Sequence, residues 1–230
     1  MLRLDGIEAG YGAKTVISGV SFALEPGQIL AFLGHNGAGK TTTLKAAMGL
    51  LPLRAGQVGF DGKPIDRLSV ADRVALGLRL LPEGRGIFPD LSVAENVDVV
   101  AARNVGAGAM FRPEDVYRLF PALGERRSTR AGSMSGGQQQ MLALSLAILG
   151  APRCLMLDEP SIGLAPNLVE RMFEQVRQVC KSHAMTAVLV EQNVAAAMRI
   201  ADRVVIMNNG RIVFDGSPDE ARASNVWHYF

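Results

Sequence analysis

A glycine-rich octapeptide that directly follows a short apolar run constrains the fold of this chain more than any other feature. Residues 34–41 read Gly-His-Asn-Gly-Ala-Gly-Lys-Thr and fit the pattern G-x-x-x-x-G-K-[ST]. The run Ile29-Leu33 before them predicts a strand, and Thr41 to Leu50 after them has helical character. Glycines let backbone N–H groups turn inward around phosphate oxygens, and a helix N-terminus adds positive charge. The sequence therefore predicts a strand–loop–helix unit that binds phosphate.

Specific roles follow for the side chains of this phosphate loop. Lys40 is expected to reach the β- and γ-phosphates of a nucleotide, and the Thr41 hydroxyl is expected to ligate Mg²⁺. The predicted nucleotide-binding residues of the loop are Gly34, His35, Asn36, Gly37, Ala38, Gly39, Lys40, Thr41 and Thr42.

Two carboxylates follow a second apolar run. Cys154 to Leu157 predicts a buried strand, and Asp158 and Glu159 stand at its end, where α/β sheets open their binding crevice. Asp158 is predicted to hold Mg²⁺, and Glu159 to polarise a water for attack on the γ-phosphate. An isolated Asp-Glu pair is more often a solvated strand end, but the phosphate loop upstream favours the catalytic interpretation.

A second sequence of the phosphate-binding kind precedes the helical run from Gln139 to Leu149. It consists of Ser135, Gly136, Gly137 and Gln138. One nucleotide does not need two such loops, so this tetrapeptide is predicted to serve a nucleotide bound by another chain. The alternative is an ordinary helix N-cap at Ser135.

The order of predicted elements indicates an α/β fold with a mainly parallel sheet, because strands and helices alternate. The remaining predicted strands and helices are Leu2 to Glu8, Val16 to Leu24, Asn167 to Lys181, Thr186 to Val190 and a hairpin that turns at Asn208-Asn209-Gly210. Residues 1–230 are read as one domain: approximately 1–82 and 152–230 form the core with a β subdomain, and approximately 83–151 form an inserted helical subdomain.

Composition excludes some classes of function. The formal net charge is +2 with no basic run, which argues against nucleic-acid binding. Cys154 and Cys180 stand in apolar patterns and predict buried thiols in a reducing compartment. The first residues do not read as a signal peptide, and the longest apolar stretch, Met141 to Leu149, is too short to span a bilayer. Any membrane role is expected to be peripheral.

Three motifs in this order and spacing resemble those of ABC transporter ATPases: residues 34–41, Met134 to Gln138 and Leu155 to Glu159. The likeness covers essentially the whole chain. It implies a RecA-like P-loop NTPase core with an N-terminal antiparallel β subdomain and an inserted α-helical subdomain, with ATP and Mg²⁺ as cofactors. It also implies a head-to-tail dimer with a second ATPase domain, either a paralogue or a second copy, in which each ATP lies between one phosphate loop and the partner's signature tetrapeptide.

The same resemblance implies two membrane permease subunits, a periplasmic solute-binding protein and a location on the cytoplasmic face of the inner membrane. Tyr11 matches the aromatic residue that stacks on adenine, with Val16 as its apolar neighbour; a packed core aromatic is the alternative. Ile87-Phe88-Pro89 is a predicted contact for a permease, with local core packing as the alternative.

Three positions and one segment depart from the common pattern of the family; the segment, Ser161 to Pro166, lacks the aspartate often found there. Glu83 stands where a Mg²⁺-sensing glutamine is usual, Gln192 where a histidine is expected to contact the γ-phosphate, and Leu146 where arginine is common. A glutamine can hydrogen-bond the phosphate but cannot carry a proton. Glu83 is counted among the predicted metal-site residues, and Gln192 among the catalytic residues together with Lys40 and Glu159.

Segments around these departures resemble one branch, the LivF-type ATP-binding subunit of branched-chain amino acid importers. The segments are Pro82 to Arg85, Val190 to Asn193 and Ser161 to Pro166. Urea, amides and other amino acids remain alternative solutes. A non-transport ABC ATPase and a regulatory subunit that binds ATP remain alternative functions, whereas a GTPase is disfavoured because no Asn-Lys-x-Asp motif occurs.

Overall fold

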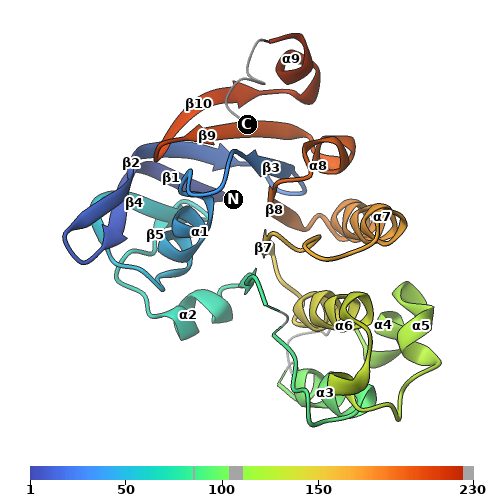
Figure 1. Cartoon of the computed structure of the whole chain (residues 1–230). Coiled ribbons are helices and arrows are strands. Elements are labelled where there is room, and N and C mark those ends of the chain that lie inside the picture. Colours follow the sequence, from blue (N-terminus) through green and yellow to red (C-terminus); the bar gives the residue numbers. More distant parts are fainter. Residues whose placement is uncertain (85, 104–110, 225–230) are drawn as a thin grey trace.

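Two β-sheets and a separate group of helices make up the molecule (Figure 1). The computed structural model describes residues 1–84, 86–103 and 111–224. Arg85, part of one of the family-like segments, lies outside the described residues, as do residues 104–110 of the predicted helical insertion. The division near residues 82 and 152 stays a prediction.

The N-terminal sheet is antiparallel and has the strand order β2-β1-β4-β5. Its strands are β1 (Leu2–Tyr11), β2 (Lys14–Leu24), β4 (Leu53–Phe60) and β5 (Lys63–Pro64). The register of β1 and β2 runs from Leu2 opposite Leu24 to Tyr11 opposite Lys14. The predicted antiparallel β subdomain is therefore confirmed, and Tyr11 lies at its hairpin turn.

The second sheet has the order β10-β9-β3-β8-β7-β6, and all neighbours are parallel except β9 and β10. Its strands are β3 (Ile29–Leu33), β6 (Leu78–Leu81), β7 (Cys154–Asp158), β8 (Thr186–Glu191), β9 (Arg203–Asn208) and β10 (Arg211–Gly216). Every residue of β3, β7 and β8 is buried, as expected for strands covered on both faces. The phosphate loop leaves this sheet at β3, between β8 and β9.

The helices fall into two sets in Figure 1. Those packed near the sheets are α1 (Lys40–Met48), α2 (Val70–Ala75), α7 (Pro166–His183), α8 (Val194–Ile200) and α9 (Pro218–Ala223). Those grouped to one side are α3 (Val93–Ala101), α4 (Pro113–Leu119), α5 (Pro121–Gly124) and α6 (Gly136–Leu149), with a 3-10 turn at Ala131–Ser133. Among the described residues, no helix has both the length and the apolar composition needed to cross a membrane.

Alternate residues of the parallel sheet feed two apolar cores. Ala31 and Leu33 of β3 pack into the core that α6, α7 and α8 cover. Leu30 and Phe32 point the other way, into the core shared with α1 and the N-terminal sheet. Because successive side chains of a strand point to opposite faces, the parallel sheet becomes the middle layer. The phosphate loop lies at the carboxyl ends of its strands.

Some elements differ from their sequence-based boundaries. Strand β4 was not expected, because its residues 54–57 (Arg-Ala-Gly-Gln) are all exposed, include a glycine and show no alternation of apolar and polar side chains. Helix α6 begins at Gly136 instead of Gln139. Leu146 is buried in the helical core. Cys154 and Cys180 are free and buried, as predicted.

Candidate nucleotide-binding site

Two glycines of the phosphate loop occupy backbone conformations and spaces that no other residue fits. Gly34 has φ 146° and Gly39 has φ 110°. A Cβ atom on Gly34 would lie 2.3 Å from the Met207 carbonyl oxygen, and one on Gly39 would lie 2.7 Å from Cγ2 of Ile17. Gly39 also precedes α1 without any side-chain cap, so the first N–H groups of that helix are open to a phosphate.

Lys40, the first residue of α1, is buried and points back into the loop. Its Nζ atom donates to the carbonyl oxygens of Gly34 at 2.6 Å and His35 at 3.0 Å, and lies 3.9 Å from a carboxylate oxygen of Glu159. The pKa of Lys40 lies below its usual value because burial, the largest effect, lowers it; the charges of Glu159 and Asp158 oppose this shift. Its three partners are all oxygens, so the ammonium group stands where it could meet phosphate oxygens as well.

Thr41 and Asp158 form the candidate magnesium site. The Thr41 hydroxyl donates to Oδ1 of Asp158 at 2.9 Å, which joins the end of the loop to the end of β7. Burial raises the pKa of Asp158, and the bond from Thr41 lowers it. A hydroxyl and a carboxylate are the hard oxygen ligands that Mg²⁺ takes, with phosphate and water oxygens completing its shell. These residues therefore fit the ion.

Glu83 lies near this pair. It lines a cavity of about 430 Å³ together with Gln140, Glu159 and Ile162. Its negative charge contributes to raising the pKa of Asp158. Within the described residues, no three His, Cys, Asp or Glu side chains cluster closely enough to hold a metal ion by themselves. A direct metal ligand role for Glu83 stays a prediction.

Glu159 and Gln192 meet at the mouth of the phosphate loop. Glu159 follows β7 with φ 49°, a left-handed conformation that is uncommon for a residue with a side chain. The Gln192 side-chain amide donates to its carboxylate. Glu159 also lines a pocket of about 120 Å³ with Val16 and residues 37–42, which include Ala38 and Thr42. The predicted general base is thus brought to the predicted phosphate site.

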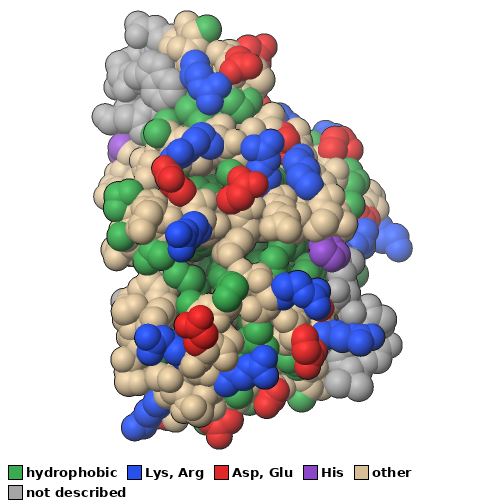
Figure 2. Space-filling model, turned by 90° about the vertical axis from the view of Figure 1, so that its right-hand side faces the viewer, with side chains coloured by type: hydrophobic (Ala, Val, Ile, Leu, Met, Phe, Trp, Pro, Cys, Tyr) green, Lys and Arg blue, Asp and Glu red, His purple; other side chains and the backbone are tan. Residues whose placement is uncertain are grey.

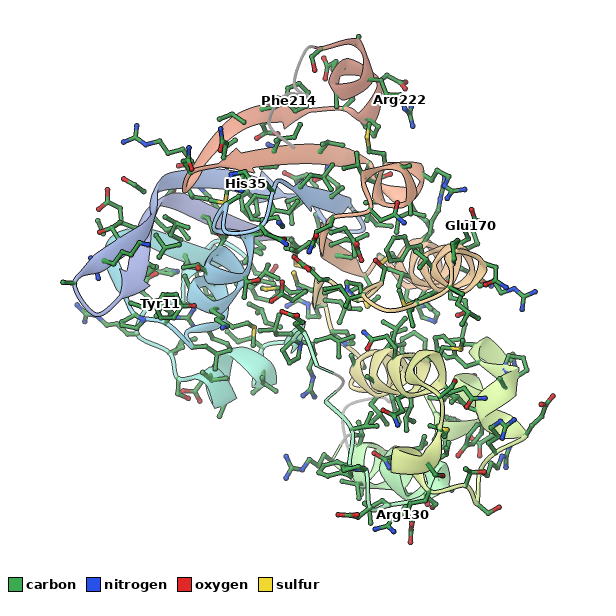
Figure 3. All side chains as sticks on the ribbon, in the orientation of Figure 1. Tyr11, His35, Arg130, Glu170, Phe214 and Arg222 are labelled. Atoms are coloured by element: carbon green, nitrogen blue, oxygen red, sulfur yellow. The ribbon has the colours of Figure 1, made fainter. Side chains whose placement is uncertain are left out.

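Tyr11 extends from the hairpin turn between β1 and β2, and His35 lies in the phosphate loop (Figure 3). Tyr11 is 48% exposed, so it is not a core residue, and Nζ of Lys45 lies 6.0 Å from its ring centroid. His35 bonds to the Asn36 carbonyl at 2.6 Å and to the Asn208 side chain at 3.0 Å. These contacts tie the loop to the end of β9.

Arg54 supports the turn that presents Tyr11, a contribution that the sequence did not suggest. Its guanidinium donates to the carbonyl oxygens of Gly12, Ala13 and Lys14 and to the Thr15 hydroxyl, at 2.5–3.2 Å. No pattern within β4 signals this role, because the turn lies about 40 residues earlier in the chain.

The signature tetrapeptide caps helix α6. The Ser135 hydroxyl accepts from the backbone N–H of Gln138 at 3.4 Å, and the Gln138 side chain accepts from the backbone N–H of Ser135 at 3.1 Å. A Cβ atom on Gly137 would lie 2.9 Å from Leu168 of α7. Gly136 and its neighbours do not line the phosphate-loop pocket in the described part of the chain. The N-cap reading is therefore correct for this chain alone, and the role toward another chain stays a prediction.

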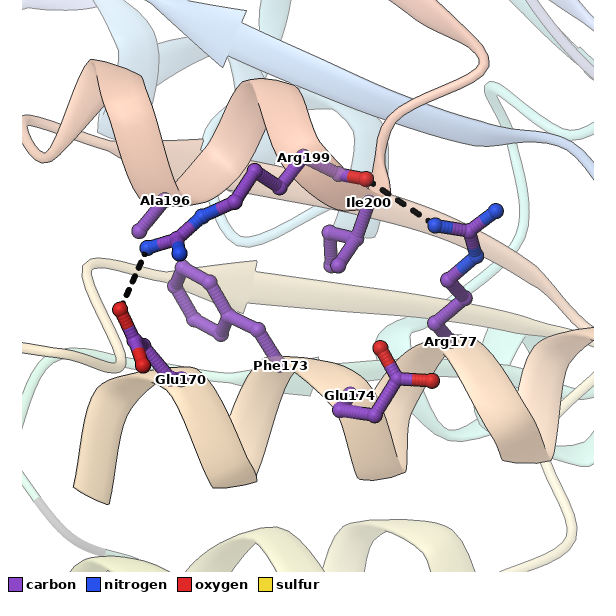
Figure 4. A pocket seen from close by; sticks show the side chains of 7 residues that line it. All are labelled: Glu170, Phe173, Glu174, Arg177, Ala196, Arg199 and Ile200. Atoms are coloured by element: carbon purple, nitrogen blue, oxygen red, sulfur yellow. Dashed lines mark hydrogen bonds and ion pairs between the residues drawn. The ribbon is translucent and has the colours of Figure 1, made fainter. Parts of the chain in front are cut away.

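Another groove, of about 380 Å³, lies between α7 and α8 (Figure 4) and includes no residue of the phosphate loop in its lining. Three of its four charged side chains bond to the protein itself: Arg199 pairs with Glu170 at 2.9 Å, and Arg177 donates to the Arg199 carbonyl at 3.1 Å. On the face shown in Figure 2, basic and acidic side chains are interspersed without a patch of one sign. The groove is a contact region between two helices, and none of its lining residues lines the phosphate-loop pocket.

Comparison with known proteins gives concordant results. Residues 17–162 match the family described as ABC transporter. The chain is 37% identical to the high-affinity branched-chain amino acid transport ATP-binding protein BraG of Pseudomonas aeruginosa, over 93% of this chain and 91% of that protein. It is 34% identical to the probable branched-chain amino acid transport ATP-binding protein LivF of Archaeoglobus fulgidus, over 96% and 93%.

The chain is also similar to an ATP-binding protein named for export and to solved structures. The Nod factor export ATP-binding protein I of Paraburkholderia xenovorans is 32% identical, over 98% of this chain and 73% of that protein. A solved structure of the ATP-binding subunit of an ABC transporter superposes with a TM-score of 0.83 at 28% identity, over 97% of this chain and 92% of that one.

Proposed function

The chain belongs to the ABC transporter family as an ATP-binding subunit, and from this premise we propose that it hydrolyses Mg²⁺-bound ATP at the site around Lys40 to power transport. One observation carries the proposal: the phosphate loop, Thr41 with Asp158, and Glu159 with Gln192 converge at one edge of the parallel sheet.

Each side chain of the site has a separate role in the proposed reaction. Thr41 and Asp158 hold Mg²⁺, which when bound neutralises phosphate charge. Lys40 and the N–H groups of residues 37–41 bind the phosphate oxygens. Glu159 orients the attacking water and takes its proton. Gln192 keeps the Glu159 carboxylate in place and contacts the γ-phosphate, but it cannot accept a proton.

The test is ATP hydrolysis by the full chain with Mg²⁺, compared between the native protein, Glu159→Gln and Glu170→Gln. Glu170 is a matched control, because it is an exposed glutamate on α7 that pairs only with Arg199 among the contacts of the described residues. We expect Glu159→Gln to lower kcat by about 10²–10⁴-fold with ATP still bound, and Glu170→Gln to remain active. Equal activity of all three proteins would refute the assignment of Glu159.

We further propose branched-chain amino acids as the imported solutes. Two relatives named for branched-chain amino acid transport match nearly the whole chain, and the segments at Glu83, Ser161 and Gln192 resemble the same branch. The relative named for Nod factor export keeps export as the alternative. Uptake of labelled leucine by cells that lack this gene, rescued with the native chain or Glu159→Gln, tests the solute. Normal uptake in the deleted strain would discard the solute and leave the ATPase assignment intact.

The proposed partners are a second ATPase domain, packed head to tail, and two permease subunits on the cytoplasmic face of the membrane, supplied by a periplasmic solute-binding protein. The signature residues Ser135 to Gln138 support this arrangement, since they stay outside the chain's own phosphate pocket. Sedimentation of Glu159→Gln with and without ATP tests self-pairing. An ATP-dependent dimer is expected if two copies pair, and a monomer under both conditions would require a paralogue.

Phe88 is the proposed contact with a permease. Its ring is 47% exposed, while its backbone N–H and carbonyl are both bonded to the side chain of Asn96, at 2.8 and 2.9 Å. Ile87 packs against the helical core, so core packing accounts for Ile87 but not for Phe88. Phe88→Asp is expected to abolish co-purification with the permeases. Val213→Asp, at an exposed apolar position on β10, serves as the control that should leave assembly unchanged.

A further inference from the structure

The last residue of β8, Glu191, is a carboxylate buried to 1% exposure that accepts four hydrogen bonds. The backbone N–H and the hydroxyl of Ser161 donate to it at 3.0 and 2.7 Å. The backbone N–H groups of Gln192 and Asn193 donate at 3.2 and 3.3 Å. Two of the four donors belong to Ser161 and two to residues 192–193, so Glu191 clamps these two parts of the chain together.

A carboxylate suits this set of donors because both of its oxygens accept hydrogen bonds. Burial raises the pKa of Glu191, and the four hydrogen bonds oppose that shift. Three of the four donors are backbone N–H groups, which cannot rotate or change role. A side-chain amide in the same place would direct its own N–H₂ group at one or more of these donors. At least one buried donor would then lose its partner, which is costly in a site closed to water.

The clamp lies beside the reacting groups. Glu191 stands opposite Leu33, the residue before Gly34, in the parallel pairing of β8 with β3. The backbone N–H of Glu159 donates to the carbonyl of Val190 at 2.9 Å, one residue before the clamp. Gln192, the next residue, carries the amide that holds the Glu159 carboxylate. A shift of the 192–193 segment would therefore move the partner of the proposed general base.

The segments that the clamp joins lead into structures that are themselves tied together. Residues 161–165 lead into α7, and residues 192–193 lead into α8. Phe173 of α7 and Ile200 of α8 belong to the same apolar core and line one groove between these helices (Figure 4). Gly137 of the signature tetrapeptide packs closely on Leu164 and Leu168 at the start of α7. The Glu191 clamp therefore lies close to the starts of α7 and α8, and Gly137 of α6 packs against the same region.

We propose that Glu191 is a positioning residue for ATP hydrolysis: its carboxylate joins Ser161 to residues 192–193 and so holds the Gln192 amide on Glu159. This inference rests on the proposed hydrolytic function. The four hydrogen bonds of Glu191 in the described part of the chain go to Ser161, Gln192 and Asn193, and its charge affects the pKa of Lys40 less than the charges of Glu159 and Asp158 do. The clamp should therefore affect mainly kcat and change ATP binding little.

The experiment measures steady-state Mg²⁺-ATPase activity of the full chain for Glu191→Gln, Glu191→Asp, Ser161→Ala and Gln192→Ala, and for both substitutions at positions 191 and 192 together. We expect Glu191→Gln to lower kcat by about 10–100-fold with KM for ATP within about twofold of native. Ser161→Ala should cause a smaller loss, since it removes one donor of four. Glu191→Asp, which keeps the charge, should recover part of the rate lost in Glu191→Gln.

A double-mutant cycle separates positioning from general damage to the fold. If Glu191 acts through Gln192, the double variant should be no slower than Gln192→Ala alone. Fully additive losses, a native kcat for Glu191→Gln, or a raised KM with unchanged kcat would each overturn the proposal. Should Glu191→Gln fail to fold, Ser161→Ala in a cycle with Gln192→Ala decides the question by the same criterion.

Glu159→Gln, assayed in parallel, distinguishes this inference from the function on which it rests. An inactive Glu159→Gln protein together with native rates for the Glu191 variants refutes only the positioning role. A fully active Glu159→Gln protein refutes the proposed hydrolytic site, and the clamp with it.

Discussion

The guanidinium of Arg73 closes the far end of the helix that begins in the phosphate loop. Arg73 is 2% exposed and lies on α2. It donates to the carbonyl oxygens of Ala46 and Ala47, at 3.3 and 2.7 Å, and to those of Asp66 and Leu68, at 3.2 and 3.3 Å. The carbonyls of Ala46 and Ala47 are among the last four of α1, which lack the usual partner one turn further on. The Ala46 carbonyl also accepts from the backbone N–H of the capping residue Gly49 at 3.0 Å. Arg73→Ala is therefore expected to destabilise the protein.

The magnitude follows from these four contacts. The short bond to Ala47 is charge-assisted and contributes about 1.5–3 kcal/mol, and the three longer bonds contribute about 0.5 kcal/mol each. Removing a buried charge recovers part of its desolvation cost, which lowers the sum. We expect a loss of about 2–4 kcal/mol in the free energy of unfolding, which corresponds to a decrease in Tm of about 5–12 °C in a chain of this size.

Urea unfolding followed by circular dichroism measures this loss. Arg67→Ala is the control, because Arg67 is exposed in the same loop region and its replacement should cost less than about 0.5 kcal/mol. Arg73→Lys should be intermediate, since one ammonium cannot reach all four carbonyls. If Arg73→Ala unfolds at the same urea concentration as Arg67→Ala, with the same slope, the reasoning about the helix end is wrong.

Three further predictions concern single positions. Burial raises the pKa of the Cys154 and Cys180 thiols to about 12, so neither should react with a thiol reagent at pH 8 until the chain is unfolded, when both should react. Gly34→Ala should abolish ATP binding measured by calorimetry and lower Tm, because its Cβ would meet the Met207 carbonyl; Gly62→Ala, with φ 74° and open space, should cost only about 1–2 kcal/mol. Arg54→Ala should raise KM for ATP about threefold with kcat unchanged, since it loosens the turn that presents Tyr11 through exposed hydrogen bonds.

The sequence predicted the elements whose signal is local. The phosphate loop is a continuous octapeptide, and β3, β7 and β8 are apolar runs because both faces of the parallel sheet are covered. The turn at residues 208–210 was recognisable from its Asn-Gly pair. The convergence of Thr41, Asp158 and Glu159 was predictable as well, since parallel strands end at the same edge of a sheet.

Features that depend on distant partners could not be read in the same way. Strand β4 forms because β1 offers it a hydrogen-bonding edge, although its own residues 54–57 are exposed and carry no alternating apolar pattern. The hydrogen bonds of Glu191 could not be predicted from the segment 190–193, because its partner Ser161 lies 30 residues earlier in the chain. The same is true of Arg73, because its two acceptors in α1 lie 26 and 27 residues before it. A buried charge has no pattern that distinguishes it from a surface charge until its surroundings are known.

The inward orientation of Lys40 affects how its variants should be interpreted. Its ammonium group donates to the first two carbonyls of the phosphate loop from inside. The lysine therefore also stabilises the conformation of the loop to which it belongs. Replacing it removes a phosphate ligand and, at the same time, the internal brace. The drop in ATP affinity of a Lys40 variant will therefore exceed the energy of the lysine–phosphate contact, because part of the drop measures the relaxation of the loop.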